Sequence, residues 1–246
     1  MEGNEITNII KLGSFSLNGD LIQTGIQCYS GHDTLAFQDT VPGTEISWVD
    51  TGDLLVSDRC ICIGLSWESL NKAGYISGTR VWIDNAPYIC RCLMGGGRKG
   101  EKNEWDDLLR KYGDSDDLWH WHGNPFWCQE TPPDYGMLGA RVVRGGKAPD
   151  EWSTRGWNLE IWNIGFRPVL ERIPRMTVDF SGLEGREICV YGPHDQSIAG
   201  RVLSVDDYDL VLTTNTSLPP NCSWTTASKC GTIIRRGEIW SIKQIN

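Results

Sequence analysis

The chain of 246 residues is long enough for one large domain, or for a medium domain with a small companion. Its formal net charge of −9 argues against a nucleic-acid partner, because such a partner is held by basic side chains that contact phosphates. Residues 1–25 lack the features of a signal peptide and no stretch approaches ~20 apolar residues, so the sequence predicts a cytoplasmic protein with no membrane partner.

The first hundred residues contain mostly strand-like runs separated by turn residues. The tetrapeptide at 17–20 contains Asn-Gly, which supplies two positive-φ positions and predicts a hairpin turn. Residues 1–50 are accordingly interpreted as a β hairpin region or an arm. A short helix is predicted over 66–73, with Ser66 as its cap. The predicted strands are Leu54–Ile63, Arg80–Ile83 and Tyr88–Leu93.

The clearest helical signal lies at residues 103–112. Asn103 can cap this helix, acidic side chains fill its first turn, basic ones fill its last turn, and Gly113 ends it. Beyond the helix, strands are predicted at Ala140–Val143 and Gly165–Leu170.

Two sets of side chains are candidate metal ligands, and a structural interpretation is favoured for both. Structural zinc sites favour Cys-x₂₋₄-Cys on turns, whereas the two Cys-x-Cys pairs lie in strand-like runs, where buried free thiols are common. An Asp-rich turn that leads into an aromatic strand accounts for the second set without a metal. No cofactor is therefore predicted, and the nine Cys are expected to be reduced thiols. The two sets are Cys60, Cys62, Cys90 and Cys92, and Asp114, Asp116, Asp117, His120 and His122.

The character of the sequence changes near residues 172–175. Before this point the segments are rich in Trp and Gly, and after it come short strands at turn-punctuated spacing. This pattern predicts that residues 175–246 form a small β-barrel of the SH3/Sm-like type. Its strands are expected at Glu187–Tyr191, Arg201–Val205, Leu210–Thr214, Gly231–Ile234 and Ile239–Ile242.

Signals for catalysis are weak. The glycine-rich run at 95–100 lacks the Gly-Lys-Ser/Thr ending of a phosphate loop and does not lead directly into a helix, so it is interpreted as a flexible hairpin loop. The sequence contains no Gly-x-Ser-x-Gly elbow and no His-Glu-x-x-His motif, and no pair of carboxylates stands out as catalytic. An enzyme of an unrecognised type is kept as an alternative.

Residues 119–171 carry the most informative motifs. Phe-Trp-Cys-Gln-Glu at 126–130 precedes an Arg-Gly-Gly turn, and a Trp-rich segment then leads to Gly-Phe-Arg-Pro-Val-Leu-Glu at 165–171. This order resembles the C-terminal half of the C-type-lectin-like fold found in formylglycine-generating enzymes and in retroelement-diversified variable proteins. The stretch 54–171 also resembles uncharacterised proteins of Firmicutes and their prophages that have a similar ending.

The resemblance implies an α+β fold, with a C-type-lectin-like domain over residues 51–172 followed by the β-barrel. It also implies structural roles for the two motifs that flank the Trp-rich segment. These roles have a physical basis, because glycines allow tight turns and a planar guanidinium can bind several loop carbonyls. Formylglycine-generating enzymes need two cysteines near the closing strand to hold copper, and residues 129–188 contain no Cys, so that oxidase activity is not expected. The motif residues are Arg144, Gly145, Gly146, Gly165, Phe166 and Arg167.

The segment between these motifs spans residues 147–164, and its residues 147–163 are the predicted binding surface. It carries Trp at regular intervals together with adaptable polar groups, a composition typical of recognition surfaces. In the resembling folds this position displays the variable surface. The alternative is that the Trp side chains fill the core of a domain with little regular structure. The candidate residues are Trp152, Trp157, Asn158, Glu160, Trp162 and Asn163.

The sequence therefore predicts a non-catalytic binding protein that recognises a protein or a glycan. The resemblance implies that this protein is of phage or prophage origin. Residues 175–246 hold 7 basic and 8 acidic side chains, which leaves −8 of the net charge on residues 1–174. This acidity would attract a basic host protein, although ordinary solubility explains the same charge. The main alternative is an inhibitor, encoded by a mobile element, that blocks a host defence protein through its acidic surface, as an anti-CRISPR-like or anti-nuclease protein.

Overall fold

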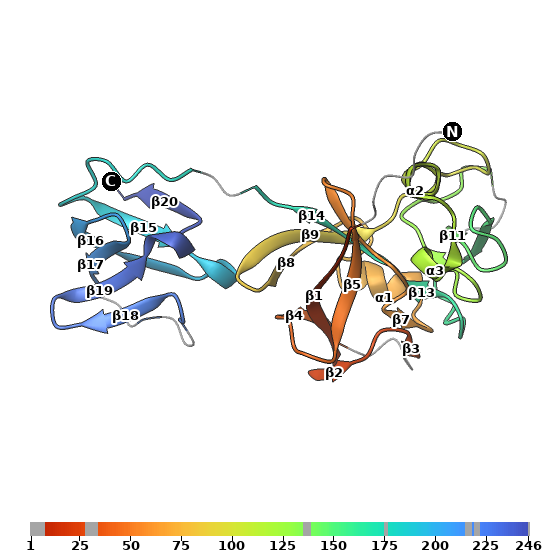
Figure 1. Cartoon of the computed structure of the whole chain (residues 1–246), viewed down its shortest axis with the longest axis horizontal. Coiled ribbons are helices and arrows are strands. Elements are labelled where there is room, and N and C mark those ends of the chain that lie inside the picture. The colour runs from red at the N-terminus through yellow and green to blue at the C-terminus, as the bar shows by residue number, and fades with distance from the viewer. Residues whose placement is uncertain are drawn as a thin grey trace. The chain divides into compact units, whose positions relative to one another are not determined.

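The computed structural model describes residues 8–27, 34–134, 139–174, 177–214, 218 and 222–245. The chain divides into two compact units, one of residues 1–84 and 88–172 and the other of residues 85–87 and 173–246. Strands dominate both units, and the helices of the described residues are few and short (Figure 1). The coarse prediction of a fold that combines many strands with a few helices is confirmed. No helix within these ranges is long and apolar enough to cross a membrane.

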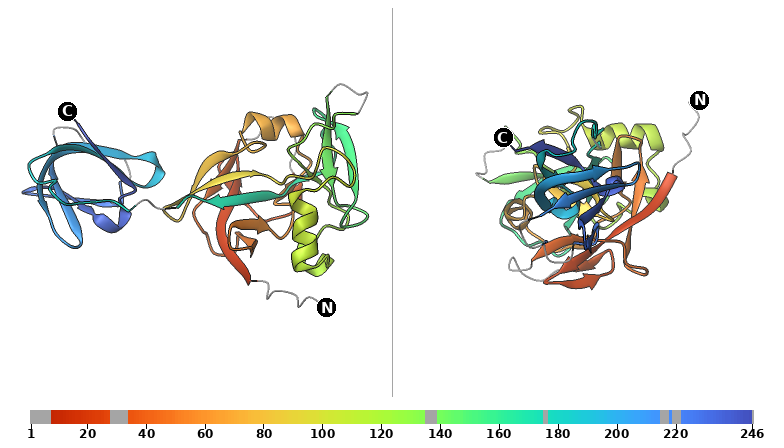
Figure 2. Two further views of the ribbon diagram at one scale, coloured as in Figure 1. Left: turned by 90° about the horizontal axis from the view of Figure 1, so that it is seen from above. Right: turned by 90° about the vertical axis from the view of Figure 1, so that its left-hand side faces the viewer.

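The first unit is built on an eight-stranded sheet that curls (Figure 1 and Figure 2). Its strands are β1 (Asn8–Leu17), β2 (Asp20–Ile22), β4 (Leu35–Gln38), β5 (Glu45–Asp50), β6 (Leu54–Ser57), β8 (Thr79–Ile83), β9 (Ala86–Cys92) and β14 (Pro168–Arg172). Their order is β2-β1-β5-β6-β14-β9-β8, with β4 paired to β1. Strand β14 therefore lies between β6 and β9, although it is the last of the eight in the chain.

The N-terminal strands belong to this sheet. Strand β1 turns into β2 through Asn18 and Gly19, whose φ angles of 53° and 90° form the predicted hairpin turn. Strand β1 also pairs with β5, and β5 pairs with β6. The described part of residues 1–50 is thus continuous with the sheet of residues 51–172, and strand pairing shows no break at residue 50.

A second, six-stranded sheet lies in the same unit. Its strands are β3 (Ile26–Gln27), β7 (Cys62–Ile63), β10 (Phe126–Trp127), β11 (Ala140–Arg144), β12 (Trp152–Gly156) and β13 (Gly165–Phe166), and their order is β12-β11-β10-β13-β7-β3. The predictions of unbroken strands at 54–63 and 165–170 are wrong, because each segment is divided between the two sheets. In the first segment the Ser57 hydroxyl donates to the Arg59 carbonyl (2.7 Å), and the chain turns there.

Arg167 lies where the closing segment crosses from one sheet to the other. Its side chain has no exposed surface. Its Nη1 donates to the Ser57 carbonyl (3.0 Å) and its Nη2 to the Trp119 carbonyl (2.5 Å). The guanidinium also packs against the Phe126 ring, 4.9 Å from its centroid. This arginine therefore joins backbone segments that are far apart in the sequence.

Both predicted helices are present. Helix α1 (Trp67–Lys72) begins after Ser66, whose Oγ accepts a hydrogen bond from the Ser69 N–H (3.1 Å). Helix α2 (Glu104–Tyr112) begins after Asn103, whose Oδ1 accepts from the Asp106 N–H (2.9 Å). These local caps explain why the two helices could be predicted from sequence.

A third, one-turn helix replaces the expected Asp-rich turn and aromatic strand. Helix α3 (Asp116–Trp119) begins after Ser115, whose hydroxyl accepts from the Asp117 N–H (3.2 Å). Acidic residues in its first turn favour a helix there. The helix ends at His120, which has a left-handed backbone with φ 42°. The predicted strand is therefore wrong, because the cap at Ser115 favours a helical turn.

Buried Trp side chains hold the loops of the first unit. A buried indole must satisfy one N–H group, and a backbone carbonyl is the usual partner. The Nε1 atoms of Trp48, Trp105 and Trp127 donate at 2.7 Å to carbonyls of Leu12, Pro149 and Leu65, respectively.

The second unit contains a six-stranded antiparallel sheet around a core that includes the buried Trp224. The five predicted strands are present, but the last begins at Ser241, because a 3₁₀ turn occupies Arg236–Glu238. The sixth, β18, was not predicted because its residues are polar and mostly exposed. In the order β18-β19-β17-β16-β15-β20 the strands are Thr225–Ser228, Gly231–Arg235, Asp209–Thr213, Ser197–Val205, Glu187–Tyr191 and Ser241–Gln244.

Candidate binding site

The loop of residues 157–164 carries most of the predicted binding residues. At one end, the Trp157 carbonyl accepts a hydrogen bond from the Glu68 N–H (2.9 Å). At the other end, the Ile164 carbonyl accepts from the Gly64 N–H (2.8 Å). Both ends of the loop are thus hydrogen-bonded to the chain around Leu65, about a hundred residues earlier in the sequence.

Large side chains between these ends are exposed. Trp162 is 68% exposed and Trp157 is 37% exposed. Asn158 and Glu160, beside them on the same loop, are also exposed. The alternative in which the Trp side chains fill the core therefore does not apply to Trp162.

The side chains of two of the six predicted residues form hydrogen bonds to the framework. Trp152 lies in β12 and is half-buried, and its Nε1 donates to the Gly96 carbonyl (2.9 Å). Asn163 is half-buried, and its Nδ2 donates to the Gly123 carbonyl (3.2 Å). The structure brings the other four together on the exposed loop.

Trp157 is held against the backbone. A Cβ atom added to Gly139 would lie 2.3 Å from Cδ1 of Trp157, so the indole covers this glycine. The Trp157 N–H also donates to the Gly139 carbonyl (2.9 Å). A ring that is already fixed loses little conformational freedom on binding, which suits an anchor residue.

A small cleft of about 170 Å³ adjoins the loop. Gly145 and Gly146, with φ angles of 75° and 108°, form part of its wall. Lys147 and Arg155 contribute positive charge, and Glu151 contributes negative charge and accepts from the Lys147 N–H (3.0 Å). The predicted binding surface contains these three charged residues, but the sequence did not single them out, because no local signal separates them from ordinary surface charges.

Arg144 supports this turn from the interior. Its side chain is buried and forms an ion pair with Asp106 of α2. Its Nη1 donates to the Gly95 carbonyl (2.7 Å) and its Nε to the Glu151 carbonyl (3.0 Å). The position of the cleft wall therefore depends on the start of helix α2.

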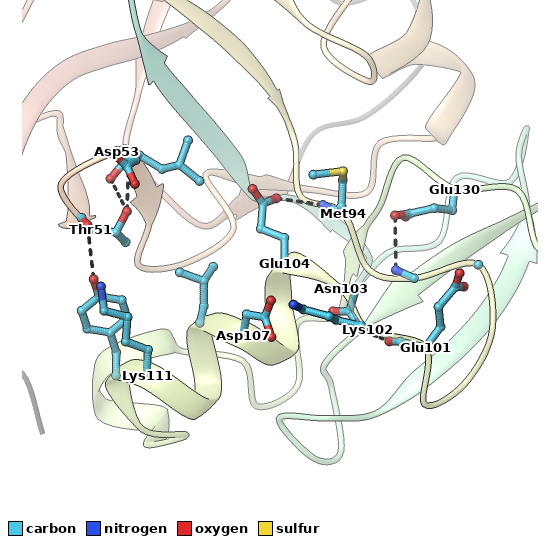
Figure 3. Close-up of a pocket in the computed structure, with 15 residues that line it drawn as sticks. Thr51, Asp53, Met94, Glu101, Lys102, Asn103, Glu104, Asp107, Lys111 and Glu130 are labelled. Atoms are coloured by element: carbon cyan, nitrogen blue, oxygen red, sulfur yellow. Dashed lines mark hydrogen bonds between the residues drawn. The ribbon is translucent and has the colours of Figure 1, made fainter. Parts of the chain in front are cut away.

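A larger pocket of about 580 Å³ lies along α2 (Figure 3) and is called the α2 pocket below. Its lining includes Glu130, whose carboxylate accepts the N–H groups of Gly95 (3.0 Å) and Gly96 (3.2 Å). These two N–H groups point at the protein's own carboxylate, so this part of the glycine-rich run does not form a phosphate loop.

The Cys-x-Cys pairs do not form a metal site. Cys62 lies in β7 of the smaller sheet, whereas Cys90 and Cys92 lie in β9 of the larger one. Within the described ranges, no group of three or more His, Cys, Asp and Glu side chains could hold a metal ion. Burial raises the pKa of the Cys60 thiol to about 11, which keeps it protonated near neutral pH.

The two histidines contact neighbouring protein groups instead of each other. Nε2 of His120 lies 3.0 Å from Nη2 of Arg59, and its Nδ1 lies 3.7 Å from Asp58 Oδ2. The backbone N–H of His122 donates to Asp116 Oδ1 (2.7 Å). Asp116 therefore ties the residues after α3 back to the start of that helix.

The site is thus an exposed loop with two Trp rings, fixed at both ends and adjoined by a small charged cleft. Comparison of the chain with protein families, curated proteins and solved structures gives no significant match.

Proposed function

We propose that the protein is a non-catalytic binding protein that recognises a protein or a glycan through the loop of residues 157–163. The observation that carries the proposal is the exposure of two Trp rings on a loop whose ends are bonded to the framework. Exposed aromatic surface is unfavourable in water, and a partner that covers Trp162 would relieve this cost. Trp is also among the residues most enriched at the energetic centres of interfaces.

The neighbours of the two rings suit a partner that has both apolar and polar groups. Leu159 is 48% exposed and extends the apolar area. Asn158 can donate and accept hydrogen bonds, and Glu160 adds a carboxylate. A sugar ring, with an apolar face and hydroxyls at its edge, matches this combination, and so does a mixed patch of protein side chains.

The proposal includes a finer fold assignment, in which residues 51–172 are C-type-lectin-like and residues 175–246 form an SH3/Sm-like barrel. The first part is supported by the place of the loop, between the turn at Gly145 and the closing segment that starts at Gly165. The second is supported by a six-stranded antiparallel sheet around a single core. The proposal also includes phage or prophage origin, on the resemblance of residues 54–171 to prophage proteins, and a protein of that origin would act in the host cytoplasm.

The test uses ligands selected with the wild-type protein from a glycan array and from a displayed peptide library. Trp162→Ala is expected to weaken binding of a selected ligand about thirtyfold, or ~2 kcal/mol, because an anchor ring is lost. Its melting temperature should stay near that of the wild type, because the ring is mostly exposed. Binding is measured by calorimetry and melting by circular dichroism.

Tyr208→Ala is the matched control, since this aromatic side chain is 81% exposed in the second unit. It should bind the selected ligand normally. Wild-type affinity in both Trp157→Ala and Trp162→Ala would show that the loop is not the site, and so would early melting of both variants.

A further inference from the structure

The α2 pocket has no role in the function proposed for the loop of residues 157–163. Its volume of about 580 Å³ lies within the range of ~300–1,000 Å³ that is typical of ligand sites. Helix α2 forms one wall, residues around Met94 form a second, and the turn at Thr51 forms a third (Figure 3). The pocket is therefore large enough for a small molecule or for a side chain of a partner.

One part of the lining is apolar. Leu54, Leu108 and Tyr112 contribute to it, together with Met94, which is 42% exposed. The Tyr112 hydroxyl donates to the Thr51 carbonyl (3.4 Å), which satisfies the polar end of this side chain. This part can cover an aliphatic stem and remove it from water.

The rest of the lining is acidic. Five carboxylates face two amines, a formal balance of −3. Glu104 pairs with Arg91, whose Nη2 lies 2.7 Å from Glu104 Oε1, and Asp107 pairs with Arg110, whose Nη1 lies 2.6 Å from Asp107 Oδ1. The remaining carboxylates still outnumber the two amines. The carboxylates belong to Asp53, Glu101, Glu104, Asp107 and Glu130, and the amines to Lys102 and Lys111.

Glu130 is the carboxylate best placed to meet a ligand. Its oxygens are oriented by the N–H groups of Gly95 and Gly96, and each oxygen keeps a second lone pair. The ion pairs found among the described residues do not include Glu130. Its negative charge is thus fixed in place and not matched by a basic side chain of the described chain.

We propose that the α2 pocket binds an organic cation, an ammonium or guanidinium group carried on an aliphatic stem. The cation pairs with Glu130, and the stem lies against Met94 and Leu108. A guanidinium suits this carboxylate because it can form two parallel hydrogen bonds. A metal ion suits it less, because no group of three or more metal-ligating side chains occurs in the part of the chain that the structure describes.

The test is titration calorimetry of the whole chain with two probes, agmatine and a short peptide that contains a single arginine. Glu130→Gln is expected to weaken agmatine binding at least about tenfold, because a charge-assisted hydrogen bond is lost. Asp117→Asn removes the same charge from an exposed site on α3, outside the pocket, and should leave the affinity unchanged. If Glu130→Gln does not fold, Met94→Ala tests the pocket in its place, by comparison of agmatine with methylguanidinium.

The apolar part of the pocket is tested separately. Met94→Ala should weaken agmatine several-fold but leave binding of methylguanidinium, which has no stem, unchanged. Tighter binding of the peptide would identify the occupant as a side chain of a partner protein, and tighter binding of agmatine would identify a free amine. Trp162→Ala should keep agmatine affinity, so that failure of the loop and failure of this pocket can be distinguished. The inference is overturned if neither probe binds, or if Glu130→Gln and Asp117→Asn weaken binding equally.

Discussion

Arg167 is a charged side chain with no exposed surface, and backbone carbonyls, rather than a carboxylate, accept its hydrogen bonds. The rings of Trp105 and Phe126 lie 5.3 and 4.9 Å from the guanidinium and provide favourable cation–π contacts. Burial lowers the pKa of Arg167, which records the cost of removing its charge from water. A planar group with several donors can bridge two separate chain segments, and a lysine ammonium cannot reproduce that geometry.

Arg167→Lys is therefore expected to lower the free energy of unfolding by about 2–4 kcal/mol, because it leaves a buried charge with fewer partners. Urea unfolding followed by circular dichroism measures this loss. Arg110→Lys is the control, since the Arg110 side chain is 69% exposed, and its effect should stay within ~0.5 kcal/mol. Equal stability of the two variants would show that the carbonyl contacts of Arg167 contribute little.

The candidate binding residues could be predicted from the sequence only in part. Trp162 and its polar neighbours lie on a loop with little regular structure, and a composition argument is sufficient to identify such a loop. The role of Trp152 depends on the Gly96 carbonyl, 56 positions earlier in the chain, and no local pattern reports such a contact. The α2 pocket was missed for the same reason, because its lining comes from four separate segments.

Among the elements, helices α1 and α2 could be predicted because their caps and charges are local signals. Strand boundaries were harder to predict, because an apolar run does not indicate which sheet it joins. The run at 54–63 contributes to both sheets of the first unit, and the partner strands that decide this lie far away in the sequence. The edge strand β18 was missed because its polar residues show no apolar alternation.

Gly165 shows how tightly the closing segment fits between its neighbours. A Cβ atom added to it would lie 2.6 Å from the Cys62 carbonyl oxygen and 2.7 Å from the Cys60 Cβ. Gly165→Ala is therefore expected to lower the free energy of unfolding by about 1–3 kcal/mol or more, because β13 and β7 must separate. Gly237→Ala is the control, since no atom lies within 4 Å of the added Cβ. Similar urea midpoints for both variants would contradict this close packing.

At the level of the whole molecule, each unit has its own hydrophobic core. The core of the second unit contains Trp224 and strand residues from β15 to β19, all of them from residues 173–246. A sheet of six strands around one core is large enough for independent stability.

A fragment of residues 173–246 is accordingly expected to fold alone and to unfold in a single cooperative transition. Far-ultraviolet circular dichroism and amide protection measure this. Trp224→Ala should abolish the transition or lower its stability by about 3–5 kcal/mol, because a buried ring is removed. A random-coil spectrum for the unmodified fragment would show that its sheet depends on the rest of the chain.

The late position of β14 in the chain affects how the protein emerges from the ribosome. Strands β6 and β9 are complete by residue 92, but β14, which joins them, begins at residue 168. At about 5–20 residues per second, translation of the intervening 75 residues takes roughly 4–15 s. During this interval both strand edges of the nascent chain lack their final partner and can pair with another chain. Slow translation would lengthen the exposure, and a nascent chain that stops before residue 168 would leave the larger sheet in two parts.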